Sequence, residues 1–121
     1  MKPMLEQVSA SPVVEIAAGE VFIEEGKKSG RLYVLVDGLI EVFRGDVEIA
    51  LAETPGAMFG EMSLLLDAPH TATVRAVRAS RLHVIEDAIG YLRDRPMLAL
   101  PIAQLLARRL QNATTYLVDL K

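Results

Sequence analysis

The chain has 121 residues, of which 51% are hydrophobic and 24% charged, a composition typical of one globular domain with a single core. Its net charge of −3 provides no positive field for nucleic acid or anionic membranes, and no apolar run reaches the roughly 18 residues needed to span a bilayer. The absence of cysteine excludes disulfides, thiol catalysis and thiolate metal sites. With no signal peptide at the start of the sequence, we expect a cytoplasmic protein.

Residues 13–86 alternate short apolar runs with turns that carry glycine or proline, such as Asp37-Gly38 and Pro55-Gly56. Many short strands at this spacing are typical of a sandwich or barrel. Around Gly45 the pattern predicts a tight hairpin, because glycine accepts a positive φ. We therefore expect a β-roll of two small antiparallel sheets. Its strands are predicted at residues 13–16, 21–23, 32–36, 39–43, 47–51, 71–77 and 82–85.

The stretch 59–76 combines a glycine-led turn, a short helix and a β-branched strand. Gly60 allows the backbone to approach a ligand, and residues 62–66 predict one or two helical turns whose N–H groups face it. Glu61 stands where a carboxylate can accept a sugar hydroxyl. This combination suits a sugar-phosphate site. The alternative for Glu61 is a carboxylate favoured by the dipole at a helix start.

After Glu86 the apolar spacing changes from that of strands to that of helices. Asp87 is predicted to cap a short helix over residues 88–94, which must end before Pro96. A long helix is predicted over about residues 97–119, with apolar residues on two sides. One stripe has the a/d spacing of a coiled coil and contains Ala103, Leu106, Leu110, Ala113, Leu117 and Leu120; the other contains Leu98, Ile102 and Leu105.

A helix that is apolar on two sides needs two burial partners. We expect the Leu98 stripe to pack on the roll and the a/d stripe to pack on the same helix of a second copy, giving a homodimer. The alternative is one broad stripe buried in a monomer. Arg108 and Arg109 are predicted to form a solvated face of this helix.

In this order, the roll, glycine-led turn, short helix and long helix resemble a cyclic-nucleotide-binding domain of the catabolite-activator type. Residues 59–76 are similar to the family's phosphate-binding cassette. Further similarities are the Gly19-Glu20 turn, residues 32–38 and the start of the dimer helix at residues 106–110. The resemblance implies a single domain over residues 1–121 that is mainly β with C-terminal helices. Its jelly-roll-like β-roll, a double-stranded β-helix over about 13–86, precedes a helical tail over about 87–121 that ends in a long dimerisation helix.

The resemblance also implies a ligand site for cyclic AMP, cyclic GMP or a related anion, with no cofactor required. Glu61 would accept the ribose hydroxyl, and the N–H groups of Gly60, Glu61 and Met62 would face the sugar-phosphate. On the long helix, the family directs two hydroxyl side chains at the purine, and their positions fall on Ala113 and Thr114. Only Thr114 keeps a hydroxyl. The implied ligand-binding residues are Phe59, Gly60, Glu61, Met62, Ser63, His70, Thr71, Ala72 and Thr114.

His70 occupies the position of the family's phosphate-binding arginine. An arginine fork neutralises a phosphate through two parallel N–H···O bonds, whereas histidine offers one donor and is mostly uncharged at neutral pH. Charge-assisted hydrogen bonds contribute about 1.5–3 kcal/mol each, so the substitution is expected to weaken nucleotide binding about ten- to a hundredfold or more. The alternative for His70 is an exposed loop histidine.

Two functions remain open on the sequence. One is a sensor domain that binds a cyclic nucleotide; the other is a degenerate domain that dimerises or binds a protein without nucleotide, which His70 and Ala113 favour. An enzyme is not expected, because the two histidines, His70 and His83, form no close pair for a metal and no nucleophile–base arrangement is visible. Direct DNA binding is not expected either, because no helix-turn-helix follows the long helix in this sequence.

Overall fold

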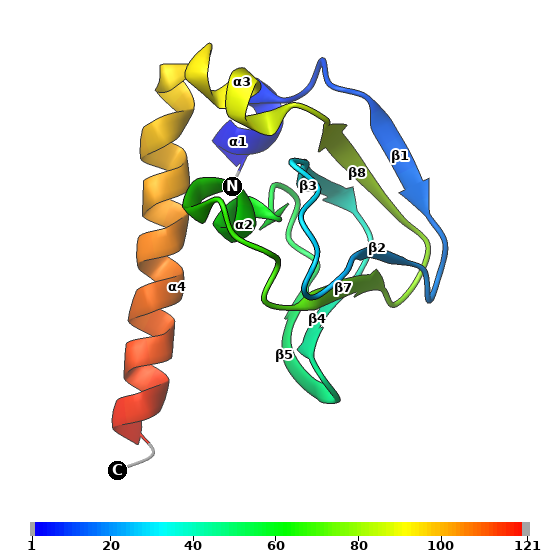
Figure 1. Cartoon of the computed structure of the whole chain (residues 1–121), viewed down its shortest axis with the longest axis vertical. Helices are drawn as coiled ribbons and strands as arrows, with labels where there is room; N and C mark the ends of the chain where they lie inside the picture. The colour runs from blue at the N-terminus through cyan, green and yellow to red at the C-terminus, as the bar shows by residue number, and fades with distance from the viewer. Residues whose placement is uncertain (1, 120–121) are drawn as a thin grey trace.

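The computed structural model describes residues 2–119, and the side chains of residues 5–112. Strands form a roll, and the helices gather along one side of it, with the long α4 standing outermost (Figure 1). The elements in order are α1 (Lys2–Gln7), β1 (Val13–Ile16), β2 (Val21–Ile23), β3 (Leu32–Asp37), β4 (Ile40–Arg44), β5 (Val47–Ala52), β6 (Met58–Phe59), α2 (Glu61–Leu66), β7 (Thr73–Ala76), β8 (Ser80–Ile85), α3 (Ala88–Arg93), a 3-10 turn (Pro96–Leu98) and α4 (Ala99–Asp119).

The roll consists of two antiparallel four-stranded sheets, with strand orders β1-β8-β3-β6 and β2-β7-β4-β5. This confirms the predicted fold class, and every predicted strand is present with its ends shifted by two residues or fewer. The predicted hairpin joins β4 to β5, with Gly45 at φ 57°. The sequence reasoning missed α1 and the two-residue strand β6, which are too short to show a periodic pattern.

Strand β3 separates the two halves of the core. Because successive side chains point to opposite faces of a strand, Tyr33 and Leu35 lie inside the roll, while Leu32 and Val34 face the helices. The helical half of the core also contains Val8 and Leu98. The four consecutive buried residues of β3 are therefore explained by apolar layers on both of its faces.

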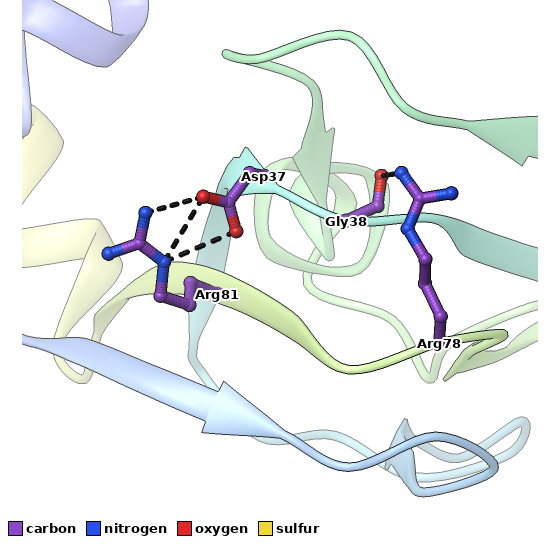
Figure 2. A network of polar contacts seen from close by, with 4 residues as sticks. All are labelled: Asp37, Gly38, Arg78 and Arg81. Carbon is purple, nitrogen blue, oxygen red and sulfur yellow. Dashed lines mark hydrogen bonds and ion pairs between the residues drawn. The ribbon is translucent and has the colours of Figure 1, made fainter.

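The turn after β3 is closed by a glycine and two arginines (Figure 2). Gly38 has φ +129°, and a Cβ on it would lie 2.0 Å from Ser80 Oγ, so no other residue fits without a shift. Asp37 pairs with Arg81 across the β3–β8 ladder, and Arg78 Nη2 donates to the Gly38 carbonyl at 3.4 Å. Arg81 donates to Asp37 and lowers the pKa of that carboxyl. Since both charges are exposed, this pair orients the strand end and contributes little to stability.

The helical tail follows the predicted order. The Asp87 side chain accepts a hydrogen bond from the Gly90 N–H at 3.3 Å and caps α3, as expected. The long helix begins with the 3-10 turn rather than as continuous α-helix from residue 97. Leu98 and Ile102 are buried in the helical half of the core, with Leu105 partly buried against it, which confirms the stripe predicted to pack on the roll.

The other stripe of α4 is largely uncovered within the part of the chain that the structure describes, although Leu106 is partly buried against the helical half of the core. Leu110 is 69% exposed, and Ala103 is exposed. Figure 1 shows the C-terminal half of α4 extending away from the roll. Ala113 and Leu117 lie on α4 and Leu120 beyond it, but all three fall outside the described side chains. Among the described helices, none is long and apolar enough to cross a membrane.

Leu98 should contribute strongly to stability, because it is fully buried where the helical tail meets the roll. Leu98→Ala removes apolar contacts and leaves a cavity, so we expect a loss of about 2–5 kcal/mol in the free energy of unfolding. The matched control is Leu100→Ala, since Leu100 is 65% exposed two residues away. Denaturant unfolding of both variants checks this, and equal losses would contradict the core assignment.

Candidate functional site

The turn between β6 and α2 is built around Gly60, which has φ +94°. A Cβ on this residue would lie 2.8 Å from the Arg31 carbonyl oxygen and 3.7 Å from His70 Cε1. Glycine is therefore required both by the left-handed conformation and by the close approach of residue 31. This turn brings the backbone of Gly60, the start of α2 and the ring of His70 together, as the sequence analysis expected for the phosphate end of a cassette.

Glu61 follows this turn as the first residue of α2, and its side chain is buried, with 5% of the residue exposed. It points towards α4, where Arg109 Nη1 donates to its Oε1 and forms an ion pair. The same guanidinium donates through Nη2 to the Met58 carbonyl at 3.0 Å. A buried carboxylate needs such a partner, because an isolated charge removed from water is strongly unfavourable.

The Glu61–Arg109 pair has two consequences for the site. Among contacts between described residues, only Oε1 of the carboxylate is engaged, so Oε2 keeps its capacity to accept a hydrogen bond from a hydroxyl group. The pair also ties the cassette to the helix that carries the tail. Burial lowers the pKa of Arg109 from its usual value, but the guanidinium stays charged at any physiological pH.

Arg109 was wrongly predicted to be part of a solvated face: it is half-exposed, but its guanidinium is bound to α2 and β6. The sequence does contain a signal for this contact. Leu98, Ile102 and Leu105 form the stripe that faces the roll, and Arg109 continues it with a spacing of four residues. A residue at this position is on the side of α4 that faces the roll, where Arg109 meets Glu61.

His70 is buried, with 8% of the residue exposed, and is not the exposed loop histidine of the alternative reading. Its backbone is held by the preceding loop: its N–H donates to the Lys27 carbonyl, and its own carbonyl accepts from the Gly26 N–H, both at 2.8 Å. Its Nε2 lies 3.3 Å from Ser29 Oγ. Burial lowers the pKa of the imidazole below its usual value of 6.5, so the ring is neutral at pH 7.

The same loop also holds the end of α2. Lys28 Nζ donates to Asp67 Oδ1 at 2.7 Å, and Asp67 is the only non-glycine residue with positive φ among the described residues. Together with the backbone bonds to His70, this contact attaches the second half of the cassette to residues 26–29. The loop thus holds both His70 and the end of α2.

The remaining residues of the implied site lie in different surroundings. Phe59 packs in the core of the roll, where its ring meets that of Phe22 edge-on. The Met62 side chain is half-exposed, and the Ser63 hydroxyl donates to the Ala68 carbonyl. Thr71 is exposed and Ala72 partly buried, and both precede β7 rather than lying within it. Thr114 lies on α4 but outside the described side chains.

The described residues contain no group of three or more histidine or acidic side chains that could hold a metal ion. Two other hollows open on the surface. One of about 580 Å³ lies between residues 7–12 and α3, and one of about 270 Å³ lies between α2, α3 and α4. Neither is lined by Gly60, Glu61 or His70. The smaller hollow touches the cassette only at Leu65 of α2, away from these three residues.

Residues 13–88 match the cyclic nucleotide-binding domain family. This chain belongs to that family. The matched residues include the whole roll, the turn at Gly60 and the start of α3, so the resemblance drawn from the cassette is confirmed.

Individual relatives agree with this assignment. The chain is 37% identical over 101 residues to the cyclic AMP receptor protein of Thermus thermophilus, covering 78% of this chain and 47% of that protein. It is 30% identical over 115 residues to the CRP-like cAMP-activated global transcriptional regulator of Mycobacterium tuberculosis, covering 88% and 50%. The crystal structure of the Thermus thermophilus catabolite activator protein superposes with a TM-score of 0.79 and 30% identity, covering 99% of this chain and 60% of that one. The chain thus spans about half the length of the curated relatives.

The lowered pKa of His70 predicts how stability depends on pH. Below about pH 6.5 the unfolded chain binds a proton on this histidine that the folded protein does not bind, so His70 makes stability fall as the pH drops from about 6.5 towards its lowered pKa. His70→Gln removes this contribution. Denaturant unfolding between pH 5 and 8 should show the wild type losing more stability than the variant on acidification. A parallel response would contradict the buried neutral ring.

Proposed function

We propose that this chain is a regulatory sensor domain that binds a cyclic nucleotide, cyclic AMP or cyclic GMP, at the cassette formed by residues 59–72. The observation that carries the proposal is the buried Glu61, which follows the Gly60 turn within the matched family region and keeps Oε2 open as an acceptor. A ribose hydroxyl is a natural donor to this oxygen. Relatives named for cyclic AMP support the ligand class, and the purine stays undecided between adenine and guanine.

The Glu61–Arg109 pair supplies a route from ligand to partner. A nucleotide that bonds to Glu61 changes the charge environment of Arg109, and Arg109 belongs to α4. Ligand binding can therefore shift α4 relative to the roll. This requires two conformations of the domain that differ in the position of α4 and in their affinity for the ligand. The output of the sensor is then a change in the contacts made by α4. This role is regulatory and involves no catalysis.

At the phosphate end, the neutral His70 ring leaves the site with a weaker cation than arginine would supply. Binding of an anionic phosphate favours protonation of the ring, so proton uptake accompanies binding and affinity rises as the pH falls. We expect the natural affinity to be modest for this reason.

Restoring arginine tests the proposal. His70→Arg should tighten binding of cyclic AMP or cyclic GMP about ten- to a hundredfold, because it adds charge-assisted bonds to the phosphate. It should also remove the pH dependence of binding seen in the wild type. His70→Gln is the matched control, with no gain. Isothermal titration calorimetry at pH 6 and 8 measures both properties. Absence of binding by the wild type and by His70→Arg would refute the nucleotide sensor.

We further propose that two copies associate through α4, as the uncovered stripe around Leu110 suggests. An exposed leucine at the a/d spacing gains burial when the same helix of another copy covers it. The sensor would act in the cytoplasm, in keeping with a sequence free of cysteine.

Leu110→Glu should therefore convert a dimer into a monomer, since it places like charges on both helices of the pair. Light scattering after size-exclusion chromatography measures the mass directly. Gln111→Glu introduces the same charge at the next residue, which does not belong to the stripe, and should leave the dimer intact. A wild-type mass of one chain at high protein concentration would contradict the dimer.

A second function has one observation in its favour. The His70 ring already occupies the space beside the Gly60 Cα, with its Cε1 3.7 Å from where a Cβ would stand. A domain whose phosphate end is filled by its own side chain would serve as a dimerising or protein-binding module without nucleotide. The titrations described above separate the two functions.

A further inference from the structure

Arg44 is a basic residue close to the cassette that the sequence analysis assigned to no site. It is the last residue of β4, whose pairing with β7 is regular from Ile40 to Phe43. Side chains alternate along a strand, and Ile40 and Val42 belong to the interior of the roll. Arg44 continues this inward series at the open end of the strand, where it is exposed to solvent.

The Arg44 side chain reaches the cassette. Its Nε donates to the Thr71 carbonyl at 2.9 Å, and Thr71 directly follows His70. The guanidinium is therefore held against the same backbone segment that carries the histidine in place of the family's arginine. The described contacts use only Nε, so the two terminal nitrogens and their N–H donors are available to a ligand.

Arg44 also differs from the other basic side chains around the cassette in whether a carboxylate pairs with it. Lys28 pairs with Asp67, Arg75 with Glu41, and Arg109 with Glu61. Arg44 forms no ion pair with any carboxylate whose side chain the structure describes. The nearby Glu25 uses Oε1 to accept the Gly45 N–H at 3.1 Å instead. One positive charge thus stands at the cassette without an internal counterion among these residues.

We propose that Arg44 supplies the cation for the cyclic phosphate that His70 does not supply. The proposal rests on the proposed function, since it identifies a further residue of the same site. A planar guanidinium presents paired donors to phosphate oxygens, and the hydrogen bond to the Thr71 carbonyl holds it beside the residue that follows His70. The substitution at residue 70 is thus compensated from the end of β4.

The exposure of Arg44 decides the expected size of its effect. An exposed charge is screened by salt and must be ordered on binding, so it contributes less than the buried fork that arginine at position 70 would make. We expect a loss of about tenfold in nucleotide affinity when the charge is removed at low ionic strength, and a smaller loss as salt is raised.

The test compares Arg44→Gln with Arg75→Gln by titration calorimetry with cyclic AMP and cyclic GMP, at low and at physiological ionic strength. Arg75 is the matched control, because it lies on the opposite face of the same sheet, paired with Glu41 and stacked over Phe43. Arg44→Gln should lose about tenfold in affinity, Arg44→Lys should lose less, and Arg75→Gln should bind as the wild type does. Thermal unfolding verifies that each variant is folded.

The outcomes separate this inference from the proposed function. If the wild type binds nucleotide and Arg44→Gln binds equally well, the role of Arg44 is wrong and the sensor stands. A loss that does not depend on salt would mean that Arg44 acts through packing, and would equally overturn its role as the phosphate cation. If His70→Arg binds nucleotide and the wild type does not, the cassette can hold the ligand but Arg44 does not replace the missing charge. If neither the wild type nor His70→Arg binds, the sensor itself is refuted.

Discussion

The ion pair between Glu61 and Arg109 connects the two halves of this protein. It joins the first residue of α2 to the outer helix α4. Glu61 and Arg109 are 48 residues apart in the sequence. A buried carboxylate without this partner would be strongly unfavourable, so the position of α4 and the burial of Glu61 depend on each other. Under the proposed function, this contact would couple the ligand site to α4.

The scaffold places this contact through strand β3. Its inner face closes the roll with Tyr33 and Leu35, and its outer face carries Leu32 and Val34 against the helices. Because both faces are packed, the helical tail cannot shift as a whole without exposing apolar surface. The 3-10 turn and the first turn of α4 are fixed by Leu98 and Ile102, whereas the more distant part of α4 extends away from the roll. The contact between Arg109 and Glu61 also attaches α4 at residue 109, so a ligand that changes this contact would move the part of the helix that carries Arg109.

The phosphate end of the cassette has a distribution of charge that differs from the family pattern. The position of the family's arginine is occupied by a buried, neutral histidine, held by the loop at residues 26–29. The nearest cation without a described counterion comes instead from the end of β4. A charge on an exposed strand end neutralises a ligand less strongly than a buried one and is more sensitive to salt.

The sequence by itself determined the architecture and the location of the cassette. Alternating apolar runs and glycine turns predicted the strands closely, and Gly60-Glu61 followed by a short helix identified the cassette, because these are local patterns with local physical causes. The partners of the charged residues were decided only by the tertiary structure. Arg109 reaches Glu61, and Arg44 reaches Thr71, across separations of 48 and 27 residues. No local pattern pairs a particular arginine with a particular acceptor. That pairing depends on which side chains the packing of the roll and α4 brings within hydrogen-bonding distance, and which charges it removes from water.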